Sequence, residues 1–383
     1  MLKTLLARGE PFFIASKAAV RQRLDLWASE LSSAGVKPFY AVKCNPDRQL
    51  IQMAAEAGWG FDCASPLEVD EVRSVDVQSD IIYANPCKSP AAIRRVDATL
   101  RGAASATATT FDSPEELEKL GSDAWRGRLI LRLKVDDSGS LQPFGSKFGC
   151  PPEDVGEVMR YLKMRHLKLS GISFHVGSNC LGGGSYRKAI ETAYDVIGRG
   201  SGSGSGSSVF ADGTLMIDIG GGFPGCDDDL FKRQADEIRR AMRREIDGRS
   251  IMYIAEPGRF LATRPYSLYV PVIAKRVGRG GDGGIQYTLD ESIYSSLSGI
   301  QFDGMKPAVE VIRSGSGSGS VGPGASNATL FGRTCDSQDI IMKGLLEEMA
   351  VGDFVCFKDA GAYTISSSSE FNGFPKTAIH WDQ

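Results

Sequence analysis

A lysine follows an apolar run near the start of the chain, where a buried strand would leave the core. The run is Pro38–Val42, and Lys43 comes directly after it. Apolar runs of this length usually lie in a core, and a core disfavours an unpaired ammonium group. A lysine at the mouth of a cleft can instead attack a carbonyl and form a Schiff base. Lys43 is therefore a candidate nucleophile.

Other segments carry groups that would suit one particular carbonyl compound. The loop "DIGGGFPG" and Arg259 can bind a phosphate through backbone amides and a guanidinium fork. Glu256, in "AEPGR", can keep a pyridine nitrogen protonated, and His175, in "FHVGS", can stack on a ring with Ser178 near the phosphate. A glycine-rich turn alone is a weak signal, but these groups together match the needs of pyridoxal phosphate. The sequence therefore predicts a pyridoxal phosphate site.

Repeated strand–helix units could bring these residues together. Eight short apolar runs end in polar or glycine residues and are followed by helix-like stretches: "PFYAVKCNP", "GFDCAS", "IIYANP", "TTFDS", "LILRLKV", "GISFHVGS", "LMIDIGGG" and "IMYIAEPG". Alternating strands and helices imply a parallel sheet, and eight units predict a closed (β/α)8 barrel. The strand ends would meet at one mouth with these residues: Lys43, Asp62, Asn85, Asp112, Arg132, His175, Gly220 to Gly222 and Glu256.

A second domain is expected beyond Arg259, where β-like runs replace the strand–helix alternation. The runs are "RPYSLYVPVIAKRV", "GGIQYTLDE", "DFVCFKDAGAYT" and "KTAIHWD", and "EPFFIAS" near the N-terminus also reads as a strand. We therefore expect a barrel over residues 20–262 and an all-β domain built from residues 1–19 and 263–383. Two Gly/Ser tracts, 198–208 and 314–320, are expected to be surface linkers without chemistry.

Composition narrows the class of protein. The chain has 383 residues and a formal net charge of −3, which gives no basic footprint for nucleic acid. It has no run of 18 apolar residues, so no membrane span is expected. Eight cysteines form no CxxC pair and only three histidines are present, so no metal site is expected. A reduced, cytoplasmic protein is the simplest interpretation.

An ordered series of motifs resembles one known family. "PFYAVKCNP", "FDCAS", "IIYANPCK", "SKFG", "FHVGSNC", "DIGGGFPG", "AEPGRF", "TCDSQD" and "GAYT" are similar to the signature series of eukaryotic-type ornithine decarboxylases, in the fold-type III, alanine-racemase-like family. The resemblance implies catalytic roles for Lys43, His175 and Cys335. It implies these cofactor-binding residues: Lys43, Asp62, Arg132, His175, Ser178, Gly220, Gly221, Gly222, Glu256, Gly258, Arg259 and Tyr363. It implies these substrate-binding residues: Asp303, Asp336, Tyr294 and Phe374.

The resemblance also implies a homodimer with active sites shared across the interface. Cys335 and Asp336 would come from the other subunit, the cysteine to govern protonation and the aspartate to bind the distal amine of the substrate. Asp303 would be a second amine-binding acid, and Lys147 and Asp339 would bridge the subunits. From the sequence alone, Cys335 could equally be a buried hydrophobe, and both amine-binding acids could be solvated.

Two departures from the family leave the substrate open. The usual Asn-Asp-Gly is Asp290-Glu291-Ser292 here, and "GPTCDG" becomes "GRTCDS", which introduces Arg333 and Ser337. L-Ornithine is the expected substrate, decarboxylated to putrescine and carbon dioxide. Lysine, arginine and diaminopimelate decarboxylases on the same scaffold are alternatives, although "CDS" argues against the last. A non-catalytic regulator like antizyme inhibitor is a further alternative, disfavoured because the residues expected to bind the cofactor are present.

Overall fold

The computed structural model describes residues 1–101, 107–121, 125–201, 208–278, 284–313 and 325–382. The chain divides into two compact units, which we call the barrel unit, Gln22–Leu261, and the sheet unit, Met1–Arg21 with Ala262–Gln383. Sequence analysis placed these boundaries after residues 19 and 262.

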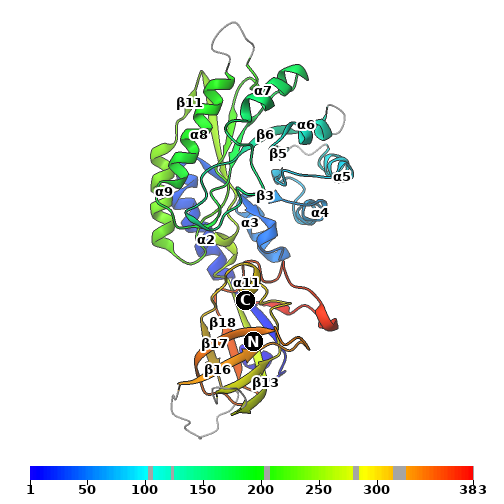
Figure 1. Ribbon diagram of the computed structural model, residues 1–383, viewed down its shortest axis with the longest axis vertical. Coiled ribbons are helices and arrows are strands. Elements are labelled where there is room, and N and C mark those ends of the chain that lie inside the picture. Colours follow the sequence, from blue (N-terminus) through cyan, green and yellow to red (C-terminus); the bar gives the residue numbers. More distant parts are fainter. Residues whose placement is uncertain (102–106, 122–124, 202–207, 279–283, 314–324, 383) are drawn as a thin grey trace. The chain divides into compact units, whose positions relative to one another are not determined.

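Eight parallel strands form a closed barrel in the barrel unit, as the sequence predicted (Figure 1). Each strand pairs with the next one along the chain, and β10 pairs with β12 to close the ring through β2. The strands are β2 (Val36–Ala41), β3 (Gly60–Cys63), β4 (Ile81–Tyr83), β5 (Thr107–Phe111), β6 (Arg128–Leu133), β8 (Gly171–Phe174), β10 (Leu215–Asp218) and β12 (Arg249–Ala255).

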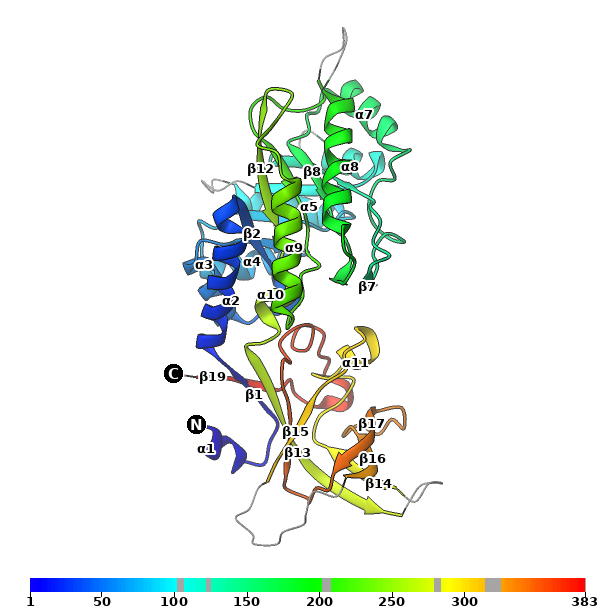
Figure 2. The same ribbon diagram turned by 90° about the vertical axis from the view of Figure 1, so that its left-hand side faces the viewer.

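Helices surround the barrel (Figures 1 and 2). They are α2 (Lys17–Glu30), α3 (Arg48–Glu56), α4 (Pro66–Val75), α5 (Pro90–Leu100), α6 (Pro114–Leu120), α7 (Val155–Met164), α8 (Ser185–Gly200), α9 (Asp228–Ala241) and α10 (Arg259–Ala262). Ser65, Ser89 and Ser113 cap α4, α5 and α6, and in each case a proline follows. The serine accepts a helical N–H and the proline fixes the first helical residue, so a Ser-Pro pair starts each helix.

The barrel interior is filled by side chains from different strands. Six buried residues, one from each of six strands, form a single cluster: Phe39, Ile82, Ala108, Ile130, Met216 and Ile254. Outside the barrel, Trp27 of α2 is fully buried and contacts the rings of Phe223, Phe231 and Phe260. These contacts hold α2 and α9 on the barrel wall, so the strand ends are carried on a rigid support.

The sheet unit is built around the long strand β13 (Tyr266–Val277). β13 pairs with β1 (Phe12–Ala15), β14 (Ile285–Leu289) and β18 (Phe354–Phe357). The other strands are β15 (Val309–Ile312), β16 (Ala325–Phe331), β17 (Ile340–Glu347) and β19 (Ala378–Trp381). Because β1 lies between β13 and β19, the N-terminal segment completes this sheet, as expected. Short helices α1 (Leu2–Leu6), α11 (Gly299–Phe302) and η3 (Phe371–Gly373) accompany it.

Some local expectations need correction. β2 ends at Ala41, so Lys43 stands in a single 3-10 turn, η2 (Val42–Cys44), and not in the strand itself. The first Gly/Ser tract was expected to be a linker throughout, but Gly198–Gly200 form the end of α8, where the helix side packs against Phe210. Residues 202–207 and 314–320 of the two tracts lie outside the described residues. β15, β16 and β17 were not among the expected strands.

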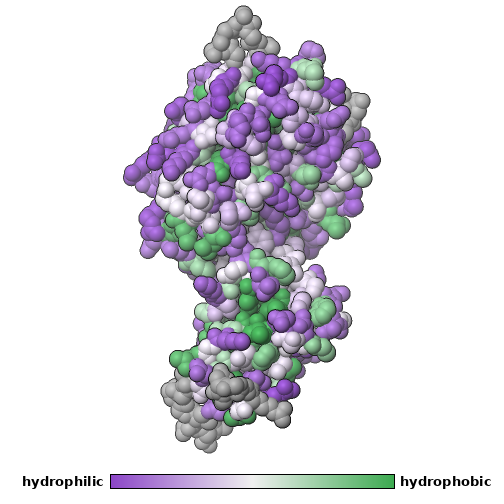
Figure 3. Space-filling model, viewed as in Figure 1, coloured by the Kyte–Doolittle hydropathy of each residue, from purple (hydrophilic) through white to green (hydrophobic). Residues whose placement is uncertain are grey.

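The remaining elements of the barrel unit are short. They are η1 (Ser32–Ala34), β11 (Glu245–Ile246), and two short strands that pair antiparallel, β7 (Ser140–Gln142) and β9 (Ser178–Cys180). In the part of the chain that the structure describes, no helix has the length and apolar character needed to cross a bilayer. The face of the barrel unit seen in Figure 3 is mainly hydrophilic, whereas a hydrophobic patch is visible on the sheet unit.

Candidate active site

Lys43 and Asp62 form an ion pair at the carboxyl ends of β2 and β3. The lysine side chain is 39% exposed and the aspartate is fully buried. Oδ2 of Asp62 accepts from the ammonium group, whereas Oδ1 is buried without a hydrogen bond. A buried carboxylate oxygen without a hydrogen bond costs free energy, so it points to a group that the site normally binds. The ion pair keeps the Lys43 amine at the mouth. A lysine can therefore follow a buried strand here, because Asp62 compensates its charge.

Two further carboxyl groups lie at the ends of β10 and β12. Asp218 is 1% exposed, and its Oδ1 accepts from the N–H of Gly220 at 2.9 Å. Burial raises the pKa of Asp218 to about 7, although hydrogen bonds from Gly220 and Glu256 act in the opposite direction. Burial raises the pKa of Glu256 well above its usual value, and the charges of Asp218 and Asp62 add to this effect. Burial and the neighbouring carboxylates therefore favour a proton on one carboxyl of this pair near neutral pH.

Asp218 is a site residue that the sequence analysis missed. It lies in "LMID", where an acid ends an apolar strand. That is the same signal that singled out Lys43, so the sequence offered a way to find it.

His175 follows β8 and is held in one tautomer. Its Nδ1 accepts from the N–H of Gly177 at 3.0 Å, so the ring proton is on Nε2. Burial lowers the pKa of His175 well below its usual value, and the cations Arg132 and Lys43 lower it further. The ring of Phe144 packs edge-on against the imidazole at 4.9 Å between centroids. A neutral, oriented imidazole of this kind can cover the face of an aromatic cofactor.

The loop after β10 can hold a phosphate because three consecutive glycines leave its backbone amides uncovered. Gly220 and Gly222 have φ angles of +65° and +105°, and a Cβ on Gly220 would lie 2.3 Å from the carbonyl oxygen of Phe174. Arg259, the first residue of α10, donates from Nε to Oγ of Ser178 at 2.8 Å. The cradle therefore combines bare backbone, a guanidinium and a hydroxyl, which are the donors that a phosphate requires.

Gly258 and Arg132, two further predicted cofactor-binding residues, also make close contacts. A Cβ on Gly258 would lie 3.0 Å from Cβ of Cys44, so glycine lets the "AEPGR" loop approach the turn that carries Lys43. Arg132 of β6 lies over the ring of Phe148 at 5.0 Å, and its charge acts on the pKa values of His175, Asp218 and Glu256.

The barrel unit thus gathers the predicted cofactor residues Lys43, Asp62, Arg132, His175, Ser178, Gly220, Gly221, Gly222, Glu256, Gly258 and Arg259. An amine that can form a Schiff base, a carboxyl for a pyridine nitrogen, a ring to cover one face and a phosphate cradle all lie at this one mouth. These residues fit pyridoxal phosphate, and the unsatisfied oxygen of Asp62 is consistent with a bound group.

The residues predicted to bind substrate lie in the sheet unit. Tyr294 donates to Oδ2 of Asp336, and this bond, with one from the N–H of Gln338, lowers the pKa of Asp336. Cys335 is exposed, and its N–H donates to Oδ1 of Asn372 at 3.2 Å. Phe374, two residues beyond Asn372, is half-buried. These contacts bring together the segments that carry Tyr294, Cys335–Asp336 and Phe374.

Asp303 and Tyr363 lie elsewhere in the sheet unit. Asp303 ends α11, where its N–H donates to the carbonyl oxygen of Gly299 at 2.9 Å. The carbonyl oxygen of Tyr363 lies 3.7 Å from a Cβ placed on Gly299. Tyr363 has a φ of +54°, a strained conformation for a non-glycine residue. Both residues therefore flank the same short helix.

Asp339 has partners within its own chain. It is 1% exposed, and its carboxylate accepts from Ser292, Thr334 and the N–H of Ile293 at 2.6–3.1 Å. A bridge to Lys147 of another subunit stays a prediction, and it would have to compete with these donors and with the N–H of Thr334, which also donates to Asp339.

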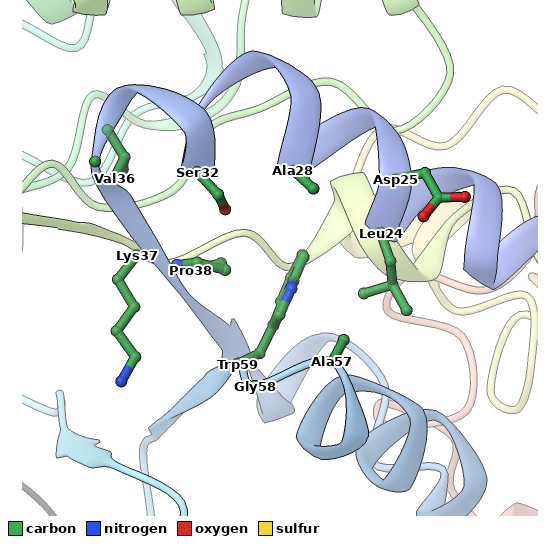
Figure 4. Close-up of a pocket in the computed structure, with 11 residues that line it drawn as sticks. Leu24, Asp25, Ala28, Ser32, Val36, Lys37, Pro38, Ala57, Gly58 and Trp59 are labelled. Atoms are coloured by element: carbon green, nitrogen blue, oxygen red, sulfur yellow. The ribbon is translucent and has the colours of Figure 1, made fainter.

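A surface pocket lies at the opposite end of β2 (Figure 4). It has a volume of about 540 Å³ and lies between α2, the first residues of β2 and the end of α3, with Trp59, Pro38 and Leu24 in its lining. None of the strand-end residues described above lines it. Because barrel enzymes carry their chemistry at the carboxyl ends of the strands, this pocket is not the active site.

Comparison with known proteins agrees with the site. Residues 17–263 match the pyridoxal binding domain of pyridoxal-dependent decarboxylases, and residues 194–361 match the C-terminal sheet domain of such enzymes. The chain is 37% identical to an ornithine decarboxylase of Schizosaccharomyces pombe, over 97% of this chain and 84% of that protein. It is 35% identical to antizyme inhibitor 2 of Xenopus laevis, over 90% and 75%. The structure superposes on the arginine decarboxylase of a Paramecium bursaria Chlorella virus with a TM-score of 0.84, at 30% identity and 97% coverage of both chains. This chain belongs to the pyridoxal-dependent decarboxylases, and pyridoxal phosphate is its cofactor.

Proposed function

We propose that this enzyme decarboxylates L-ornithine to putrescine and carbon dioxide, a step of polyamine biosynthesis. The observation that carries the proposal is the complete group at the barrel mouth, in a chain that is 37% and 34% identical to ornithine decarboxylases of S. pombe and Caenorhabditis elegans. When bound, pyridoxal phosphate withdraws electrons from the substrate's α-carbon, so that the bond to the carboxylate can break.

The chain's own residues bind and orient the reactants. Lys43 would hold the cofactor through its amine, with Asp62 as the counter-ion. Glu256 would pair as a carboxylate with the protonated pyridine nitrogen, whose positive charge would oppose the burial and neighbouring acids that raise the pKa of Glu256. His175 would cover the ring as a neutral imidazole. Because the phosphate cradle has no side chains on its glycines, Arg259 can bring its guanidinium close to the phosphate.

The acid Asp336 supports a substrate with a second amine. Its lowered pKa keeps the carboxylate ionised, so it can pair with a distal ammonium group. Binding that group would orient the α-carboxylate for cleavage, because fixing one end of the substrate restricts the other. Asp303 is proposed as the second acid. L-Lysine is the main alternative substrate, since one methylene changes the binding free energy by only about 1–3 kcal/mol.

A decarboxylation screen tests the substrate. We expect kcat/KM to be highest for L-ornithine among L-ornithine, L-lysine, L-arginine and meso-diaminopimelate, with putrescine identified by mass. Asp336→Ala should lower kcat/KM for L-ornithine on the order of tenfold or more without changing the absorbance of the bound cofactor. A higher kcat/KM for a monoamine amino acid, or unchanged kinetics in Asp336→Ala, would contradict this assignment.

We also propose that two copies of the chain share each active site. Cys335 is exposed and Asp336 lies at the surface of the sheet unit, so both could reach a partner's barrel mouth. Mixing inactive Lys43→Ala and Cys335→Ala proteins should then restore activity, because a hybrid dimer contains one intact site. Subunits that demonstrably exchange without recovery of activity would refute the shared site.

A regulator without enzymatic activity is the second candidate function, because antizyme inhibitor 2 is among the relatives. The retained ion pair of Lys43 and Asp62 disfavours it, since a regulator has no need of a nucleophilic amine. The absorbance of the purified protein separates the two. We expect a yellow protein with the cofactor bound at Lys43, whereas a colourless protein that cannot be reconstituted would favour the regulator.

A reducing cytoplasm is the proposed location. No disulfide joins any of the eight cysteines, and five of them are buried. Eight cysteines without a disulfide are typical of a compartment in which thiols stay reduced. Titration with a thiol reagent under native conditions should therefore modify the exposed Cys87, Cys226 and Cys335 before the others.

A further inference from the structure

Arg333 is a buried cation two residues before Cys335. Its side chain is 6% exposed, and it stands where the motif of the resembling family has proline. Its Nε is buried without a hydrogen bond. Burying a guanidinium costs free energy unless its surroundings compensate, so its contacts indicate what the residue does.

The guanidinium joins segments that are far apart in the sequence. Nη1 donates to the carbonyl oxygen and Oδ1 of Asp290 at 3.3 and 3.4 Å, and Nη2 donates to the carbonyl oxygen of Pro375 at 3.4 Å. The plane lies over the ring of Phe374, 4.4 Å from its centroid. Arg333 therefore connects the "LDES" segment and the C-terminal segment, residues 370–377, to the loop that carries Cys335.

The C-terminal segment has few other anchors. Among residues 370–377, only Phe374 and Thr377 are not exposed. Asn372 accepts from the N–H of Cys335, and Thr377 donates to Glu291. The ring of Phe371 packs against that of Tyr294 at 4.6 Å between centroids. With little other apolar burial, this contact, the polar contacts and the stack of Arg333 on Phe374 fix where the segment lies.

The unusual residues of this chain belong to the same cluster. Asp290 and Glu291 stand where the family has Asn-Asp, and both lie near Arg333, Glu291 at 3.8 Å. Burial raises the pKa of Asp290, and the charge of Arg333 opposes that rise. Ser292, the third change, donates to Asp339 at 2.9 Å. The three changed residues therefore contact Arg333 or Asp339, which lie on either side of Cys335 in the sequence.

We propose that Arg333 is a positioning residue that sets substrate choice, by holding Phe374 and residues 370–377 against the Cys335–Asp336 loop. The proposal rests on the proposed function, since it takes Phe374 and Asp336 as substrate contacts. Arg333 itself need not touch the substrate. Its loss should let Phe374 move, which changes the space left for the side chain of the diamino acid.

The test compares three variants of the holoenzyme. Arg333→Met removes the charge at similar length, and Arg333→Lys keeps the charge but not the planar stack. Arg313→Met is the matched control, because Arg313 is also an ion-paired arginine of the sheet unit but binds Glu347 and Asp353 instead. For each protein, kcat and KM for L-ornithine and L-lysine, the Kd of putrescine, the cofactor absorbance and Tm are measured.

We expect Arg333→Met to raise KM for L-ornithine and Kd for putrescine about tenfold, with kcat within about threefold of wild type. The ratio of kcat/KM for L-ornithine to that for L-lysine should change in Arg333→Met but not in Arg313→Met, and Arg333→Lys should be intermediate. Unaltered selectivity and putrescine binding in an active Arg333→Met enzyme would overturn the role of Arg333 alone. The role of Arg333 would also be overturned if activity fell in proportion to Tm in both Arg333→Met and Arg313→Met. A wild-type enzyme inactive on every diamino acid would overturn the proposed function together with this inference.

Discussion

The buried carboxyl of Asp218 should make the cofactor-free protein less stable as pH rises. Its pKa is about 7 in the fold, against 3.8 for an unburied aspartate. The fold therefore prefers the neutral form, and the unfolded chain ionises first as pH increases. The stability that neutral Asp218 contributes is lost between about pH 4 and about pH 7. A difference of about three pH units corresponds to about 4 kcal/mol.

Replacing Asp218 by Asn keeps the neutral form at every pH. The amide oxygen can still accept from Gly220, and a bond to Glu256 can form with its direction reversed, since the amide nitrogen donates where Asp218 accepts. We expect Asp218→Asn to be more stable than wild type by up to about 4 kcal/mol at about pH 8, and nearly equal at about pH 4.

Urea unfolding of the cofactor-free proteins at a series of pH values measures this difference. Asp25→Asn is the control, because Asp25 is an exposed carboxylate of α2 in the same unit. The reasoning is refuted if the free-energy difference between wild type and Asp218→Asn is the same at every pH. It is equally refuted if the difference grows toward low pH.

Three further predictions concern the barrel unit. Borohydride reduction followed by peptide mapping should place the cofactor on Lys43, and a label on another lysine would contradict the assignment. Gly220→Ala should destabilise the fold by about 1–3 kcal/mol and weaken cofactor binding in an absorbance titration, because its φ is +65° and the new Cβ would meet the oxygen of Phe174 at 2.3 Å. Lys88→Met should cost about 1–3 kcal/mol in urea unfolding, since Lys88 and Glu116 form a buried pair at 2.9 Å and Lys119 remains as a second cation on Glu116. A loss below about 1 kcal/mol would show that the pair contributes little.

The sequence carried enough information for the barrel and most of its mouth. Each strand is a local apolar run with a polar end, and each of α4, α5 and α6 begins with a Ser-Pro pair that acts within a few residues. Because parallel strands must all point the same way, the strand order alone predicts that Lys43, His175 and Glu256 meet at one end. These features are local or follow from topology, so they can be read without coordinates.

Tertiary structure decided the electrostatics and the contacts between distant segments. Asp218 and Glu256 lie 38 residues apart in the sequence, and their raised pKa values arise only once barrel closure buries them side by side. Arg333 meets Asp290 and Phe374 only because the sheet unit folds three separate segments together. Residue type fixes which charge a side chain can carry, whereas burial and the neighbours that folding supplies determine which charge it does carry and what it holds in place.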